Sequence, residues 1–101
     1  MPMIHQKIHL SKKQADGYVT PLGPINMVNA MTDVGMVCCG VFDVWAMERF
    51  GYPAVKVTGS SRSIANVDDL LNAKVIEVNP SAEKRGVKVG ITGREALELL
   101  Q

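Results

Sequence analysis

The segment from Gly17 to Phe42 constrains the fold of this 101-residue chain more than any other, because Asp33 is its only charged residue. The segment is longer than the roughly 20 apolar residues of a membrane-spanning helix. Prolines, glycines and asparagines interrupt it, however, and apolar residues alternate with polar ones between the interruptions. This pattern predicts strands and turns, and we expect the core and any interface or site to lie here.

Six short runs, alternating or wholly apolar, predict strands. They cover residues 3–10, 18–22, 25–31, 36–41, 54–58 and 74–78. In the first run Ile4, Ile8 and Leu10 share the buried face. Residues 11–17 are expected to form a polar turn, and Gly35 is expected at positive φ in a tight turn that Asp33 helps to close.

Four helices are predicted from capping signals, over residues 43–50, 66–71, 79–86 and 92–100. In the first helix Val44, Met47 and Phe50 are expected to face the core. Strands come first and helices are interspersed later. We therefore expect one α+β domain over residues 1–101, with a mixed, largely antiparallel sheet and three to four short helices packed mainly on one face.

Charge and cysteine content narrow the range of partners and cellular locations expected for this protein. The net charge is +1, with four basic and four acidic residues in residues 1–51 and seven and six in residues 52–101. This balance predicts no nucleic acid or anionic membrane partner. Cys38 and Cys39 are adjacent, which favours free thiols and a reducing, cytoplasmic location. The N-terminus lacks the pattern of a signal peptide, and we expect the 101 residues to be a complete protein.

Cys39 is the main catalytic candidate. It lies between a predicted strand and a helix that starts near Asp43, where a helix dipole lowers the pKa of a thiol. Cys39 would then be a nucleophile, with Asp43 orienting it. The alternative is a buried core cysteine, since no histidine is near in sequence, although folding could bring His5 or His9 close. Cys38 is expected to point to the opposite face.

A second candidate site lies at Gly90, Gly93 and Arg94, where backbone amides and a guanidinium would hold a small anionic ligand. The spacing fits neither a dinucleotide fingerprint nor a P-loop, so no cofactor is predicted. Gly86 as a helix end and Gly90 as a turn offer a structural interpretation instead. The hydroxyl-rich loop over residues 59–63 is a further anion candidate, or simply a solvated loop.

Metal binding is not predicted. His5 and His9 share one face of a strand but would lie about 13 Å apart, too far for one ion. Asp33 and Asp43 are explained as turn and cap residues. Methionines gather at four positions, where we expect core packing first and contact with a partner chain second. These are Met27, Met31, Met36 and Met47.

Three stretches resemble one known family when taken together. They are residues 33–43, residues 66–73 and residues 86–97, the last with its Gly-Arg-Glu-Ala-Leu run. Their order and spacing resemble the YunC-like family of small bacterial and archaeal proteins, over about residues 25–100. Ser63 and Asn66 depart from the Gly and Thr usual in that family.

The resemblance implies a compact α+β domain of unknown function, and it supplies no accepted substrate or catalytic residue. The positions that match the family are spread over all three stretches. They are Gly35, Cys39, Gly40, Asp43, Leu70, Leu71, Gly86, Gly90, Gly93 and Arg94.

Two functional hypotheses follow. The favoured one is a non-catalytic homo-oligomeric domain with a small anionic ligand at Arg94. The other is a small enzyme with Cys39 as nucleophile, Asp43 orienting it and Arg94 binding an anionic substrate. The first is preferred because the sequence shows no complete set of nucleophile, base and orienting group.

Overall fold

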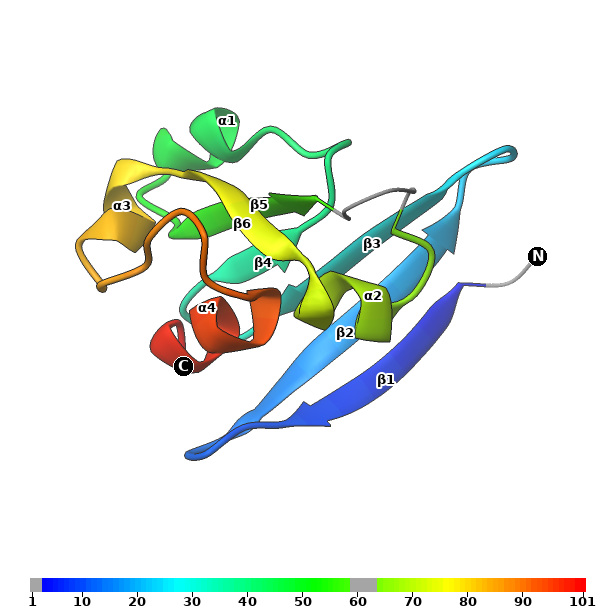
Figure 1. Ribbon diagram of the computed structural model, residues 1–101, viewed down its shortest axis with the longest axis horizontal. Helices are drawn as coiled ribbons and strands as arrows, with labels where there is room; N and C mark the ends of the chain where they lie inside the picture. The colour runs from blue at the N-terminus through cyan, green and yellow to red at the C-terminus, as the bar shows by residue number, and fades with distance from the viewer. Residues whose placement is uncertain (1–2, 59–63) are drawn as a thin grey trace.

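A single six-stranded sheet organises the chain, as the computed structural model shows for residues 3–58 and 64–101 (Figure 1). Neighbouring strands follow the order of the sequence, and every pair is antiparallel except β4 and β5. The strands are β1 (Ile4–His9), β2 (Gln14–Pro21), β3 (Asn26–Met31), β4 (Met36–Cys38), β5 (Ala54–Thr58) and β6 (Lys74–Val78). The prediction of a mixed, largely antiparallel sheet is therefore confirmed.

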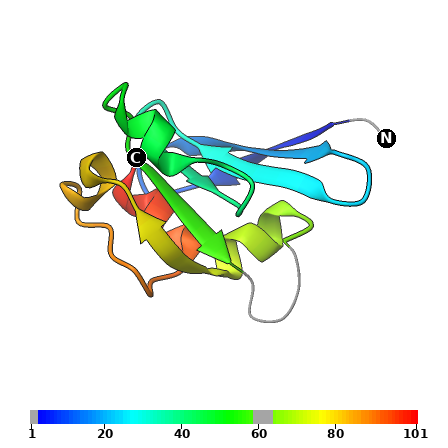
Figure 2. The same cartoon turned by 90° about the horizontal axis from the view of Figure 1, so that it is seen from above.

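Helices lie on both faces of this sheet (Figure 2). The larger core lies under α2 (Val67–Asn72) and α4 (Gly93–Leu99), and Ala82 of α3 (Pro80–Glu83) joins it. The connection between the parallel strands carries α1 (Val44–Glu48) over the opposite face, where Val44 packs in a smaller cluster with Met36, Cys38 and Ala54. The expected α+β domain is confirmed. α1 packs on the face of the sheet opposite to the one that carries the larger core.

Two predicted strand boundaries differ from the structure by three or more residues. β2 begins at Gln14, inside the expected polar turn, because Ala15 is buried and Gly17 meets Val67 of α2 on the inner face. Such small residues give little apolar signal in a sequence. β4 ends at Cys38, three residues early, because the chain turns there and the Phe42 amide donates to the Cys39 carbonyl.

Two apolar residues are more exposed than predicted. Phe50 lies beyond the end of α1 and is 86% exposed, so its expected place in the core is wrong. Ile4 is 54% exposed, because the helices on the inner face do not reach its end of β1.

Gly35 is required for close packing rather than for a positive φ, contrary to expectation. A Cβ atom at Gly35 would lie 2.7 Å from the Pro53 carbonyl oxygen. The turn is held instead by the Thr32 hydroxyl, which accepts from the Gly35 amide and donates to the Leu100 carbonyl.

Asn79, fully buried between β6 and α3, joins four segments of the backbone. Its Oδ1 accepts from the amides of Ala54 and Ala82, at 3.0 Å each. Its Nδ2 donates to the carbonyls of Val44, at 3.0 Å, and Tyr52, at 2.9 Å. One side chain thus provides hydrogen-bond partners for backbone groups in four places: the start of β5, the first residue of α1, the loop between them and the first turn of α3.

Gly93 allows the two main helices to approach each other. A Cβ atom built on Gly93 would lie 2.3 Å from the Leu70 carbonyl oxygen in α2, a distance that no side chain tolerates. The amide of Gly93 also donates to the Ala73 carbonyl. The absence of a side chain here sets the spacing between α2 and α4.

We predict that Asn79→Ala lowers the free energy of unfolding by about 3–5 kcal/mol, because it leaves buried backbone groups without partners. The exposed Asn72→Ala is the matched control and should change it by under about 0.5 kcal/mol. Urea denaturation followed by circular dichroism measures both. Equal losses in the two variants would contradict the role assigned to Asn79.

We also predict that Gly93→Ala destabilises the protein by about 1–3 kcal/mol through steric overlap with α2. Gly40→Ala is the control, since a Cβ atom there meets nothing within 4 Å. Gly40→Ala should leave stability unchanged or slightly raised, because alanine restricts the unfolded chain. Thermal unfolding tests the pair, and a Gly93→Ala variant as stable as Gly40→Ala would refute the packing argument.

Candidate functional site

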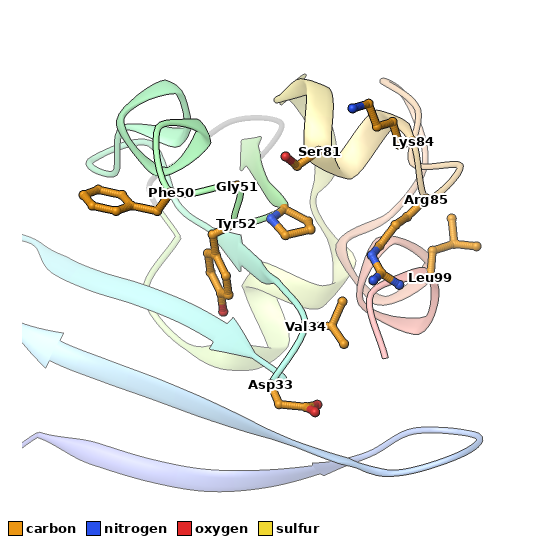
Figure 3. Close-up of a pocket in the computed structure, with 10 residues that line it drawn as sticks. Asp33, Val34, Phe50, Gly51, Tyr52, Ser81, Lys84, Arg85 and Leu99 are labelled. Carbon is orange, nitrogen blue, oxygen red and sulfur yellow. The ribbon is translucent and has the colours of Figure 1, made fainter.

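A pocket of about 850 Å³ opens where the loop after α1 meets α3 and α4 (Figure 3). Its volume lies within the range of small-molecule sites. The lining residues come from four separate stretches of the chain. They are Asp33, Val34, Phe50, Gly51, Tyr52, Pro53, Ser81, Lys84, Arg85 and Leu99.

The aromatic side of the pocket results from the end of α1. Gly51 follows the helix with φ +67°, a left-handed conformation that reverses the chain. Phe50 is thereby left in solvent, while Tyr52 turns back and its hydroxyl donates to the Thr32 carbonyl at 3.4 Å. Burial raises the pKa of Tyr52, and the nearby Asp33 raises it further, so the phenol is uncharged at neutral pH.

The basic side of the pocket follows from the end of α3. Lys84 is the C-cap of α3, and Arg85 comes next. Figure 3 shows the Arg85 guanidinium directed toward Val34 and Leu99. Within residues 3–58 and 64–101, neither Lys84 nor Arg85 forms an ion pair or a side-chain hydrogen bond.

The acidic groups around the pocket, in contrast, have partners. The Glu48 carboxylate accepts from the amide and hydroxyl of Ser81, at 2.9 and 3.0 Å. Asp33 pairs with Lys13 at 2.8 Å, and the hydrogen bond from Lys13 lowers the pKa of Asp33. The pocket therefore presents two unpaired cations beside carboxylates that are already bound.

Cys39 is buried in the larger core, where its sulfur accepts a hydrogen bond from the Val28 amide at 3.3 Å. Asp43 caps α1 by accepting from the amides of Trp45 and Ala46, on the other face of the sheet. Cys38 points to that face, as expected, and desolvation raises its pKa to about 12.

Gly90, Gly93 and Arg94 lie beside the start of β6 and at the start of α4. The Gly90 amide donates to Val75 and the Gly93 amide to Ala73, so neither is free to bind an anion. Arg94 donates to the His9 carbonyl at 3.4 Å. Gly86 and Gly90 adopt φ +91° and +100°, in agreement with the structural interpretation of both. The candidate loop at 59–63 falls outside the described residues.

The structure does not bring Cys39 and Arg94 together. The Cys39 sulfur accepts from the Val28 amide. Val28 lies opposite Val19 of β2, and Val19 lies opposite Ile4 of β1. Arg94 contacts His9, five residues further along β1, which corresponds to about 17 Å. Cys39 is buried in the core whereas Arg94 is exposed, and neither residue lines the pocket described above.

The two histidines lie on β1, as predicted. His5 stacks on Tyr18 with ring centroids 4.7 Å apart, and the Nε2 of His5 bonds Asp16. Across the residues the structure describes, no three His, Cys, Asp or Glu side chains gather as metal ligands. In the same part of the chain, no helix has the length and apolar character to cross a membrane.

Sequence patterns do not predict the pocket, because its residues are distant along the chain. The adjacent cations Lys84 and Arg85 fall inside the helix predicted over residues 79–86, and no sequence pattern assigns them a role. Phe50 was expected in the core, and nothing in the sequence predicts that Tyr52 and Arg85 line one pocket. Two neighbouring cations at a helix end near an aromatic turn are the signal that could have drawn attention to it.

Three comparisons relate the chain to known proteins. Residues 38–100 match a family described as Domain of unknown function (DUF1805). The "Uncharacterized protein YunC" of Bacillus subtilis (strain 168) is 35% identical over 72 residues, which are 71% of this chain and 71% of that protein. The solved structure of a protein of unknown function, TA1206 from Thermoplasma acidophilum, has a TM-score of 0.88 at 26% identity and covers 99% of this chain and 94% of its own.

The extent of the family match and the identity to YunC agree with the resemblance that the sequence motifs gave. The fold similarity to TA1206 spans nearly the whole chain and agrees with the α+β architecture. The chain belongs to the DUF1805 family, a domain of unknown function that includes YunC-like proteins.

Proposed function

We propose that this protein is a binding domain that takes up a small anionic molecule in the pocket beside Tyr52. The observation that carries the proposal is the charge state of the pocket wall. Lys84 and Arg85 have no acidic partner among the described residues, whereas Glu48 and Asp33 are both engaged. Unpaired cations beside a concave surface attract an anion, and the attraction weakens with salt.

The surroundings of the cations suggest the rest of the ligand. The Arg85 guanidinium can bind a carboxylate or phosphate through two parallel hydrogen bonds. Val34 and Leu99 lie beside it, and the rings of Tyr52 and Phe50 border the same pocket. A small molecule with one anionic group and one flat or apolar part fits this combination of chemistry.

The expectations of self-association and of a reducing, cytoplasmic location remain part of the proposal. Both cysteines are free and buried, a state that a reducing compartment maintains. Arg94, where an anionic ligand was first expected, is a competing binding site. Substitution of Arg85 or of Arg94 distinguishes the two sites.

We predict that Arg85→Gln weakens binding of phenyl phosphate about tenfold or more, because a charged hydrogen bond contributes about 1.5–3 kcal/mol. Arg94→Gln is the matched control, since it removes the same charge outside the pocket. NMR titration of the backbone amides gives the affinity and locates the ligand. If Arg94→Gln lost binding and Arg85→Gln kept the wild-type affinity, the anion would bind at Arg94 and the pocket proposal would be wrong.

The catalytic alternative, with Cys39 as nucleophile, makes an opposite prediction for thiol chemistry. Because Cys38 and Cys39 are 0% and 4% exposed, we expect neither thiol of the native protein to react with Ellman's reagent at neutral pH. Both should react after denaturation in guanidinium chloride. A thiol that reacts rapidly in the native protein would favour the enzyme hypothesis over the binding domain.

A further inference from the structure

The two edges of the sheet differ in how they are protected. At β6 the chain covers part of the edge itself, because the Val75 amide donates to Ile91 and the Val75 carbonyl accepts from Gly90. Lys74 also forms a bridge with Thr92. Along the outer edge of β1, no such backbone pairing occurs with any described segment.

β1 also lacks the features that usually prevent an edge strand from pairing. It has no proline and no bulge, its pairing with β2 is regular over all six residues, and Lys7 is its only charged residue. On its inner face Ile4 is 54% exposed, and Met3 next to it is 56% exposed. An open, regular edge with exposed apolar side chains is a template for another strand.

We propose that β1 pairs antiparallel with β1 of a second copy of this chain, about a twofold axis that passes through Gln6. The two sheets would then continue into one across the interface. A twofold interface places the same surface on both partners, so β1 must be complementary to itself. The register follows from three requirements: face, length of overlap and charge.

The first requirement, that paired residues point to the same face of the sheet, limits where along β1 the twofold axis can lie. Residues directly opposite each other in an antiparallel pair point to the same face of the sheet. The twofold axis must therefore pass through a residue, and the central residues of β1 are His5, Gln6 and Lys7. An axis at Gln6 or at Lys7 aligns five residues of each strand, whereas an axis at His5 aligns only three.

Charge and polarity then decide between Gln6 and Lys7. An axis through Lys7 would set two ammonium groups opposite each other, which destabilises a strand pair. An axis through Gln6 pairs Ile4 with the partner's Ile8 on the inner face. On the outer face it pairs His5 with the partner's Lys7.

Both outer-face residues already bond Asp16 within their own chain, at 2.8 and 2.7 Å. The interface in this register would therefore hold two lysines and two aspartates, whose charges balance. Apolar side chains meet apolar ones, and no unpaired charge faces its own copy.

The first test is the oligomeric state of the full chain by sedimentation velocity over a range of concentrations. We expect the wild type to form a dimer and Ile4→Lys to shift it to the monomer by at least tenfold in dissociation constant. Val89→Lys is the matched control, since Val89 is 65% exposed and far along the chain from β1. It should dimerise as the wild type does. A wild type that stays monomeric throughout would overturn the proposal.

The second test reads the register directly and does not depend on Ile4→Lys folding. In the proposed register a Gln6→Cys thiol faces the partner's equivalent at a Cβ separation of about 4.5–5.5 Å, close to disulfide range. Mild oxidation should therefore cross-link Gln6→Cys on a non-reducing gel. His9→Cys should not cross-link, since its two copies would be six residues out of register, about 20 Å apart.

The outcomes separate the proposal from other modes of association. A dimer that persists in Ile4→Lys, or one in which Gln6→Cys fails to cross-link, would place the interface elsewhere and overturn pairing through β1. Equal cross-linking of Gln6→Cys and His9→Cys would show random collision and also overturn it. None of these results bears on phenyl phosphate binding, because the pocket contains no residue of β1.

Discussion

The hydrogen bonds of one buried amide hold the functional half of the molecule together. Asn79 is fully enclosed, yet both of its polar atoms are saturated by backbone groups of β5, α1, the loop between them and α3. A buried amide with two donors and two acceptor sites fixes its neighbours in position because any displacement leaves a polar group unpaired. The segments it joins are also those that carry Phe50, Tyr52 and Ser81 to the pocket.

The pocket thus depends on a rigid frame rather than on its own side chains. Tyr52 is held from both ends, since its carbonyl accepts from Asn79 and its hydroxyl donates to Thr32. Glu48 ties α1 to α3, because its carboxylate accepts from the amide and the hydroxyl of Ser81. The frame therefore positions the pocket wall, where Lys84 and Arg85 have no acidic partner within residues 3–58 and 64–101. Most of the lining lies within residues 38–100, the stretch that matches the DUF1805 family.

Much of the fold could be predicted from sequence because its signals are local. Asp43, Asn66, Asn79 and Thr92 each cap the helix they were expected to begin, and the alternating runs became strands of one sheet. The errors have equally physical causes. Ala15 and Gly17 are too small to signal a buried strand face, and Phe50 has the helical spacing of a core residue but follows the last turn of α1.

The candidate site was less accessible to sequence reasoning, because it depends on packing between distant segments. Val34, Tyr52, Arg85 and Leu99 meet only once the sheet has formed and α3 and α4 have docked. Cys39 had a plausible local context for catalysis, but its depth in the core is set by β3 and the helices above it. Local patterns predict what an element is; they do not predict which elements share a cavity.

The attachment of the first hairpin to the end of α4 has a consequence for synthesis on the ribosome. Glu98 accepts from the amide and hydroxyl of Ser11, Gln101 accepts from the Lys12 amide, and Leu97 and Leu100 complete the core. These contacts join residues that are almost a whole chain length apart. The strands made first therefore emerge with their inner face uncovered, and after α2 has packed on β2 and β3 that face still lacks α4 until the last helix has been translated. During that interval the nascent chain exposes apolar surface on which aggregation can start.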